Sequence, residues 1–205
     1  MSDPTRARFL ALGDSYTIGE CVGAHERWPT QLVALLRAAG AVVGDAEIVA
    51  TTGWTTDELR AGIAASASLG PYDLVTLLIG VNNQYRGRPS AEYRDELREL
   101  LAHAVGLAGG RSARVIVVSI PDWGVTTLAD GQDRRAIGRA IDQFNAIGRD
   151  EATAAGAWFV DVTPTSRERR PEWEASDGFH PGAAQYAVWA RLILPAAQRV
   201  LERPR

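Results

Sequence analysis

The chain has 205 residues, of which 46% are apolar and 23% charged, a balance typical of a globular protein that buries one core. Its net charge of −3 excludes the strong basic field that recruits nucleic acid or anionic lipid, and no apolar stretch approaches the roughly 18 residues of a membrane span. The 22 basic residues are all arginine, which excludes a phosphate-loop lysine, a Schiff-base lysine and a Ser-Lys dyad.

The single cysteine and the N-terminus bear on the compartment. Cys21 has no second cysteine to pair with, so the chain cannot form an intrachain disulfide, which fits a reducing compartment. No apolar signal-peptide segment precedes the first predicted strand. We therefore expect a cytoplasmic protein, with secretion after removal of a leader as the alternative. We also expect one domain over residues 1–205, a small-molecule substrate, no nucleic-acid partner and no integral membrane association, while the oligomeric state stays open.

Five short apolar segments are predicted to be β-strands. The first, Phe-Leu-Ala-Leu, stops abruptly at Gly13. The third and fourth are almost entirely apolar, which is typical of strands covered on both faces. In chain order, the predicted strands are 9–13, 47–52, 74–80, 115–120 and 158–162.

Between the strands, the apolar period changes to that of amphipathic helices. The sequence Thr55-Thr-Asp-Glu58 predicts a capping box at the start of one of them. Apolar residues at helical spacing mark the segments 32–39, 59–63, 93–104, 137–144 and 189–200. Alternating strands and helices imply right-handed crossovers, so we expect a parallel sheet between two helical layers, which is an α/β/α sandwich.

Four places in the chain carry polar groups or glycine where a buried core would not require them. Ser15 follows the first predicted strand, Gly53 the second and Asn82 the third, so all three should lie at the carboxyl edge of the sheet, where open α/β sheets bind ligands. Asp177 and His180 are three residues apart, a spacing that lets a carboxylate fix the tautomer of an imidazole. Taken singly, each of these places is as well explained by a turn or a cap.

Taken together and in order, these positions resemble the four blocks of the GDSL or SGNH hydrolases. The blocks match at Ser15 in Gly-Asp-Ser-Tyr, at Gly53, at Asn82 in Gly-Val-Asn-Asn and at His180 in Asp-Gly-Phe-His-Pro. The resemblance covers nearly the whole chain and implies a flavodoxin-like sandwich with a five-stranded parallel sheet. That implication agrees with the strand count above.

The resemblance also implies the roles of individual residues. Ser15 would be the nucleophile, His180 its general base and Asp177 the acid that stabilises the imidazolium. The oxyanion would be bound by the backbone N–H groups of Ser15 and Gly53 and by the side-chain amide of Asn82. This chemistry needs neither a metal nor a cofactor. Since the base must be neutral, activity should rise from acid to mildly alkaline pH.

Two positions depart from the family pattern. Tyr16 stands where Leu is usual, at a position that mainly packs, so we expect little effect. Asn83 stands where the third block usually has Asp. Asn keeps the shape of Asp but loses its charge, so we expect different hydrogen bonds around the Asn82 loop, with a consequence for the rate more than for the mechanism.

Several other residues have a structural explanation that we prefer to a functional one. We expect Asp14 to cap or turn the chain, and His25 and His103 to lie at the surface or its boundary. Three histidines, one cysteine and no His-Glu-x-x-His motif argue against a dedicated metal site. Aromatic residues near the predicted edge either line a pocket or cover the core, and the sequence favours neither; they are Trp54, Tyr85, Trp123 and Trp173.

The sequence thus predicts a serine esterase or acylhydrolase for short-chain carboxylic esters, such as acetyl groups on sugars or small alcohols. A lysophospholipase, a thioesterase or an acyltransferase of the same fold are the alternatives among enzymes. A non-catalytic glycan- or protein-binding module is the alternative from another class. Loss of Ser15 or His180 would mark such a module, and both residues are present.

Overall fold

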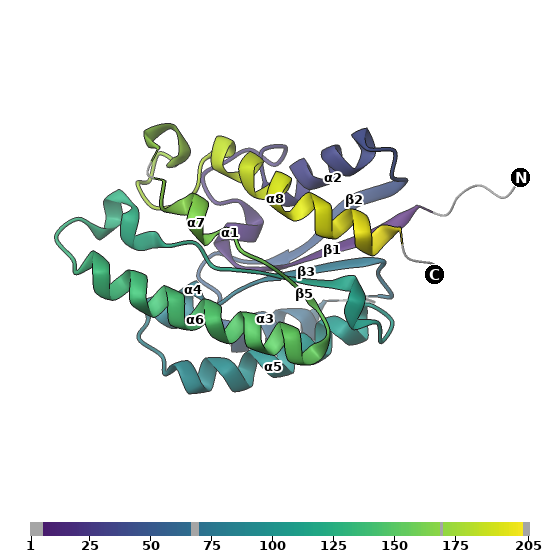
Figure 1. Ribbon diagram of the computed structural model, residues 1–205, viewed down its shortest axis with the longest axis horizontal. Helices are drawn as coiled ribbons and strands as arrows, with labels where there is room; N and C mark the ends of the chain where they lie inside the picture. Colours follow the sequence, from purple (N-terminus) through teal and green to yellow (C-terminus); the bar gives the residue numbers. More distant parts are fainter. Residues whose placement is uncertain (1–5, 67–69, 169, 203–205) are drawn as a thin grey trace, which may run out of the picture.

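The computed structural model describes residues 6–66, 70–168 and 170–202, which form an α/β/α sandwich around a five-stranded, all-parallel sheet (Figure 1). The strand order is β2-β1-β3-β4-β5. The strands are β1 Ala7–Gly13, β2 Val43–Ala50, β3 Leu74–Leu78, β4 Val115–Val118 and β5 Trp158–Val160. The predicted fold class, with its flavodoxin-like parallel sheet, is confirmed.

The boundaries of all five strands differ from the prediction. β1 begins two residues earlier than predicted, at Ala7, and β5 ends two residues earlier, at Val160. β2 begins at Val43 rather than at residue 47. It is an edge strand that pairs only with β1, so alternate residues face solvent and its first half contains polar residues. β3 and β4 end two residues earlier than predicted. The apolar residues that follow them, Ile79 and Ile120, are buried without being paired in the sheet.

Two groups of helices cover the two faces of the sheet. Helices α2 and α8 pack together on one face, and α3, α5 and α6 cover the other (Figure 1). The helices are α1 Ser15–Ile18, α2 Trp28–Ala38, α3 Thr56–Ala65, α4 Val81–Tyr85, α5 Ser90–Leu107, α6 Arg134–Ala155, α7 Thr163–Ser166 and α8 Ala183–Leu201. Short 3-10 turns lie at Ser112–Arg114 (η1), Trp123–Val125 (η2), Thr127–Ala129 (η3) and Pro171–Trp173 (η4). No helix in the described ranges is long and apolar enough to cross a membrane.

Local sequence signals set several helix ends. The capping box is confirmed, because the backbone N–H of Thr55 donates to Glu58 Oε2 at 2.8 Å and α3 begins at the next residue. Helix α6 extends well beyond the predicted segment. It begins after Asp133, whose carboxylate accepts from the N–H of Ala136 at 2.9 Å, and ends at Gly156 in the left-handed conformation, with φ 73°.

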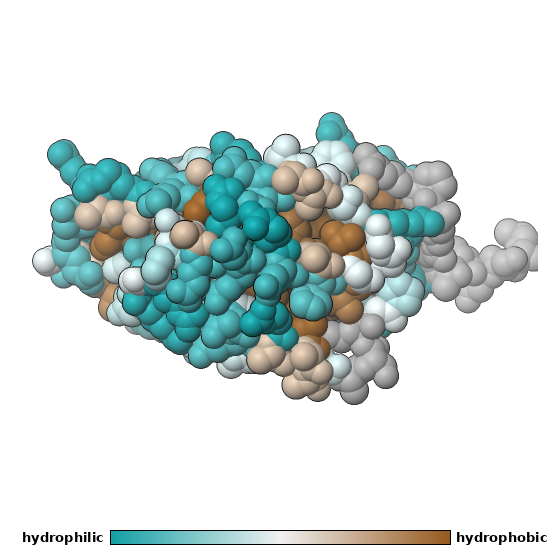
Figure 2. All heavy atoms as spheres, turned by 90° about the horizontal axis from the view of Figure 1, so that it is seen from below, coloured by the Kyte–Doolittle hydropathy of each residue, from teal (hydrophilic) through white to brown (hydrophobic). Residues whose placement is uncertain are grey.

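The outer surface of the layer formed by α3, α5 and α6, which lies at the bottom of Figure 1, is mostly hydrophilic. Figure 2 views the molecule from this side, and hydrophilic residues cover most of the face, with smaller hydrophobic areas between them. Ion pairs join two helices of this layer, α5 and α6. The buried carboxylate of Glu151 on α6 accepts from Arg94 at 2.6 Å and from Arg98 at 3.0 Å, both on α5. These contacts attach α5 to α6 without an apolar seam at the surface.

The strand order determines where a ligand crevice can form. From β1 the chain crosses to β2 on one side and then returns to β3 on the other, so the connections after β1 and β3 leave the sheet in opposite directions. Open α/β sheets bind ligands at such a switch point, outside the carboxyl ends of the strands. Ser15 follows β1 and Asn82 follows β3, so the fold places both at this point.

Candidate active site

A tight turn at the end of β1 positions Ser15. Gly13 is the last residue of the strand, and a Cβ there would lie 2.2 Å from Thr17 Oγ1 and 2.5 Å from the carbonyl oxygen of Leu78, so only glycine fits. Asp14 then caps α1, with its Oδ1 accepting from the N–H of Tyr16 at 3.0 Å. Ser15 is thus the first residue of the helix, held at the edge of the sheet with 3% of its surface exposed.

Asp14 has a structural role, as expected. Its carboxyl is fully buried, and Oδ2 has no hydrogen-bond partner among the described residues. Burial disfavours the charged form and raises the pKa of Asp14 to about 7, although the hydrogen bond from Tyr16 acts in the opposite direction. The residue before Ser15 is therefore a largely neutral acid at mildly acidic pH.

Asp177 and His180 are directly bonded in the loop before α8. Asp177 Oδ2 lies 2.5 Å from His180 Nδ1, and Oδ1 accepts from the backbone N–H groups of Phe179 and His180, each at 3.0 Å. Partial burial by itself raises the pKa of Asp177, but these hydrogen bonds outweigh it and lower the pKa to about 2. The carboxylate is thus charged over the whole range in which proteins normally work.

The same hydrogen bond sets what the imidazole can do. A carboxylate accepts from Nδ1–H, which leaves the lone pair on Nε2. His180 is 6% exposed, and its Nε2 is buried with no hydrogen-bond partner in the described part of the chain. The ring therefore offers a buried proton acceptor, as a general base requires.

Aromatic packing brings the two ends of the chain together. The ring of Tyr16, next to Ser15, contacts the His180 ring edge-on, with 5.7 Å between centroids, and the Phe179 ring at 6.2 Å. Phe179 in turn contacts His180, with centroids 4.6 Å apart. Tyr16 is thus a packing residue, as predicted. No direct hydrogen bond joins Ser15 to His180 within the described ranges, so this packing is what links them.

The segments that carry Gly53 and Asn82 are joined to each other. Asn82 Nδ2 donates to the carbonyl oxygen of Trp54 at 2.9 Å, and Arg86 Nη2 donates to that of Gly53 at 2.6 Å. Gly53 has a φ of 87°, which favours glycine. The side-chain amide nitrogen of Asn82 carries two N–H groups, and only one of them donates to a described residue. The backbone N–H of Gly53 donates to no acceptor among the described residues. Both can therefore donate to a ligand.

Asn83 both accepts and donates hydrogen bonds, whereas an ionised Asp can only accept them. It is fully buried, its Oδ1 accepts from the N–H of Thr56 at 3.1 Å, and its Nδ2 donates to Thr56 Oγ1 at 2.6 Å and to Glu96 Oε2 at 3.4 Å. The Thr56 hydroxyl also bonds Glu96. A carboxylate of α5, that of Glu96, therefore lies beside the Asn83 amide. Sequence analysis did not indicate this partner, because it lies 13 residues away on another helix.

A cavity of about 290 Å³ opens beside His180. Aromatic and polar side chains both line it, and Ser15 is not among the lining residues. The aromatic residues include Trp123, Trp173 and Phe179, and the charged ones include Arg170 and Glu174. Of the four aromatic residues left undecided above, Trp123 and Trp173 line this cavity. Tyr85 is 52% exposed and contacts the Trp123 ring, whereas Trp54 packs on Gly62 of α3.

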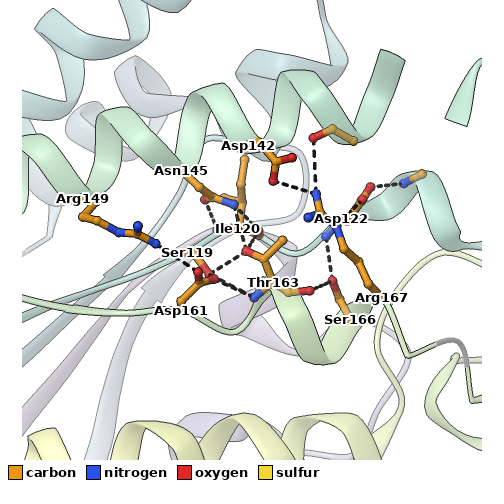
Figure 3. A network of polar contacts seen from close by, with 12 residues as sticks. Ser119, Ile120, Asp122, Asp142, Asn145, Arg149, Asp161, Thr163, Ser166 and Arg167 are labelled. Carbon is orange, nitrogen blue, oxygen red and sulfur yellow. Dashed lines mark hydrogen bonds and ion pairs between the residues drawn. The ribbon is translucent and has the colours of Figure 1, made fainter. Parts of the chain in front are cut away.

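A buried polar network fixes the segment that carries Trp123 (Figure 3). Asn145 of α6 accepts from the N–H of Ile120 at 2.8 Å and donates to its carbonyl oxygen at 2.9 Å, so it pairs with the main chain just beyond β4. Asn145 also donates to Thr163 Oγ1, which bonds Ser119 Oγ, each at 2.9 Å. These uncharged contacts attach the end of β4 to α6 and to the start of α7.

An ion pair continues this network toward the cavity. Asp122 is 5% exposed, and its carboxylate accepts from Arg167 Nε at 2.8 Å and from the N–H of Gly124 at 2.9 Å (Figure 3). Its own backbone N–H donates to Ser166 Oγ at 2.9 Å. Trp123 lies between the residues held in this way. Sequence analysis missed the network, because the elements it joins contribute partners that are 18 to 45 residues apart and form no local motif.

Cys21 lies next to Asp177 and His180, which the sequence did not indicate. It is exposed, with a left-handed φ of 63° that side-chain-bearing residues rarely adopt. Its sulfur, a carboxylate oxygen of Asp177 and an imidazole nitrogen of His180 lie within 4.8 Å of one another. Partial burial and the neighbouring carboxylate raise the pKa of the Cys21 thiol. The described residues thus contain a group of three potential metal ligands.

The Asp14 carboxyl makes stability depend on pH. In the folded state Asp14 keeps its proton up to about pH 7, whereas in the unfolded state it loses the proton near its ordinary pKa of 3.8. Between these pH values the folded state binds more protons than the unfolded state, so Asp14 lowers the free energy of unfolding as pH rises. We expect the free energy of unfolding of Asp14→Asn, measured by urea denaturation, to rise relative to that of the wild type by about 2–4 kcal/mol from pH 5 to pH 8. Asp45→Asn, an exposed variant with the same charge change, should show no such gain; equal behaviour of the two variants would contradict the assignment.

The Asn83–Glu96 contact predicts a coupled pair. Asn83→Asp removes the donated hydrogen bonds and sets a carboxylate against Glu96, so it should lower the free energy of unfolding by about 1–3 kcal/mol at neutral pH. Glu96→Gln in the same chain should recover most of this loss, because it removes the second charge. Denaturation of both single variants and the double variant measures the coupling. If Asn83→Asp lowered the free energy of unfolding by the same amount with Glu or with Gln at position 96, the two side chains would not interact.

Comparison with known proteins bears on the family and the fold of this chain. The profile of the GDSL-like lipase/acylhydrolase family matches residues 11–188. A search of curated protein sequences finds no match. Among solved structures, TesA aligns with a TM-score of 0.74 at 19% identity over 94% of this chain and 99% of its own.

Two further structures have a similar fold. The lipase/acylhydrolase from Enterococcus faecalis aligns with a TM-score of 0.73 at 18% identity, over 97% of this chain and 99% of its own. Axe2, an acetylxylan esterase from Geobacillus stearothermophilus, aligns with a TM-score of 0.71 at 22% identity, over 100% of this chain and 98% of its own. The fold is common to all three, and the family profile covers most of the chain, so this protein belongs to the GDSL-like lipase/acylhydrolase family.

Proposed function

We propose that the protein is a serine esterase that hydrolyses short-chain carboxylic esters. The observation that carries this proposal is the 2.5 Å contact between Asp177 and His180, which leaves a buried, unpaired Nε2 on a ring packed against the neighbour of Ser15. Membership of a lipase and acylhydrolase family supports the same chemistry. Ser15 is the nucleophile, His180 the general base and Asp177 the orienting acid.

In the first half of the reaction, Ser15 Oγ attacks the ester carbonyl and passes its proton to His180 Nε2. Asp177 remains ionised and stabilises the imidazolium, as its low pKa requires. Negative charge develops on the former carbonyl oxygen. The backbone N–H groups of Ser15 and Gly53 and the free N–H of the Asn82 amide bind it, each such donor contributing about 2.7–4 kcal/mol.

In the second half, the tetrahedral intermediate collapses and the imidazolium gives its proton to the departing alcohol. The acyl group remains on Ser15. Water then attacks this acyl-enzyme, with His180 taking the proton from the water and returning it to Ser15 Oγ. The products are the free acid and the alcohol, and the chain needs no further cofactor for these steps.

The cavity beside His180 supports a small substrate. Its volume of about 290 Å³ is at the lower end of the range for small-molecule sites. Aromatic side chains can stack on a sugar ring, while Arg170 and Glu174, which also line the cavity, can bond hydroxyl groups. We infer that the alcohol part, a sugar or a small alcohol, occupies this cavity and that the acyl group is short, such as acetyl. The acetylxylan esterase with the same fold is consistent with this choice.

The first test measures hydrolysis of p-nitrophenyl esters from acetate to laurate, together with acetylated sugars. We expect the shortest acyl groups to react fastest and Ser15→Ala to lower kcat by about 10⁴-fold or more. Ser176→Ala, an exposed serine in the loop of Asp177, is the matched control and should retain activity. A preference for long chains or thioesters would favour a lysophospholipase or thioesterase. Inactive wild-type protein on all these substrates would favour a binding module.

The pH dependence tests the base. The low pKa of Asp177 means that this carboxylate is not protonated until the pH approaches about 2, so its protonation cannot explain a loss of activity at mildly acidic pH. We expect kcat/KM to fall with a slope of one proton toward acid pH, because a general base must be neutral to accept the proton of Ser15, and to stay level at mildly alkaline pH. A profile that is flat down to about pH 4 would contradict the assignment of His180 as the base.

A further inference from the structure

We propose that Cys21, Asp177 and His180 form an inhibitory binding site for a thiophilic divalent cation, with Zn²⁺ or Cd²⁺ as the natural probes. Their donor atoms lie within 4.8 Å of one another. One sulfur, one imidazole nitrogen and one carboxylate oxygen make up a donor set that suits these cations. The binding site itself depends only on this geometry, while its inhibitory effect rests on the proposed role of His180 as base.

The geometry is close to that of a bound metal. Bonds of about 2.0–2.3 Å to a tetrahedral Zn²⁺ place its ligand atoms about 3.5 Å apart. Asp177 Oδ2 and His180 Nδ1 are 2.5 Å apart and would separate by about 1 Å, whereas the Cys21 sulfur, which lies within 4.8 Å of its partners, would approach by up to about 1 Å. Cys21 lies in the connection between α1 and α2 and Asp177 in the loop before α8, and both are exposed. His180 is the buried ligand, around which the two exposed residues would adjust.

The imidazole is the second observation that points to a ligand. His180 is 6% exposed, and its Nε2 is buried without a partner among the described residues, although buried ring nitrogens normally have one. Nδ1 is engaged only by Asp177, which is itself in the cluster. A cation that displaces the proton between these two groups would retain both as ligands. The bond to sulfur forms as the thiol releases its proton to solvent.

Cation binding to either ring nitrogen would prevent His180 from acting as a general base. If the cation binds Nε2, the lone pair that should accept the proton of Ser15 is occupied. If it binds Nδ1, the neutral ring carries its proton on Nε2, which then cannot accept another. Inhibition should therefore be complete at saturation and reversed by a chelator, since no covalent bond within the protein changes.

Direct metal binding gives the first test, independent of activity. We expect Cd²⁺ to produce an ultraviolet thiolate charge-transfer band that saturates at one equivalent in the wild type and in Ser15→Ala. Cys21→Ser should lack the band. In competition with a chromophoric chelator, Cys21→Ser and His180→Ala should each bind Zn²⁺ at least tenfold more weakly than the wild type. His25→Ala is the matched control, because His25 is an exposed histidine in the same connection.

Several results would overturn the site. These are absence of the band in the wild type, unchanged Zn²⁺ affinity in Cys21→Ser or His180→Ala, and a loss in His25→Ala as large as that in Cys21→Ser. If the protein hydrolyses esters, Zn²⁺ should inhibit it, and Cys21→Ser should need at least tenfold more Zn²⁺ for half inhibition relative to its own metal-free rate. Metal binding without ester hydrolysis would refute the proposed function alone, whereas hydrolysis without metal binding would refute the cation site alone.

Discussion

The contact between Tyr16 and the His180–Phe179 pair is the interaction on which the whole site depends. Tyr16 follows the first strand and His180 precedes the last helix, so this packing closes the molecule across more than 160 residues of chain. The fully buried Tyr16 ring can contact His180 only because the turn at Gly13 is tight enough to set α1 directly on the end of β1. Without that turn, Ser15 and His180, which lie at opposite ends of the sequence, would not be held next to each other.

Two aspartates of the site show how the surroundings of a carboxyl decide its charge. Asp14 receives a single hydrogen bond from Tyr16 in a fully buried position, and its pKa is raised to about 7. Asp177 is exposed and is bonded by an imidazole and two N–H groups, and its pKa is lowered to about 2. The sequence distinguishes them only by position, so their opposite electrostatic behaviour emerges from the fold.

The sequence predicts the parts of this protein whose causes are local. Runs of apolar residues locate all five strands, and the capping box locates α3, because each depends on neighbours within a few residues. The four family blocks likewise locate the candidate site. The start of β2 is hidden because an edge strand has a polar face. The partnership of Asn83 with Glu96, and that of Asn145 with Ile120, cannot be foreseen, because the residues meet only after the helices have packed.

The way Asn145 holds the end of β4 has a consequence for how such a protein can change. Asn145 bonds the main-chain N–H and carbonyl of Ile120, and Ser166 bonds the main-chain N–H of Asp122. These contacts involve main-chain atoms of the segment and therefore do not depend on the side chains of Ile120 and Asp122. Beyond them, the residues that line the cavity are Trp123, Val125, Thr126 and Thr127. These main-chain anchors place no direct constraint on those four side chains, while the base of this wall stays fixed. Loop exchange or directed evolution confined to these residues offers a route to new substrate ranges on an unchanged scaffold.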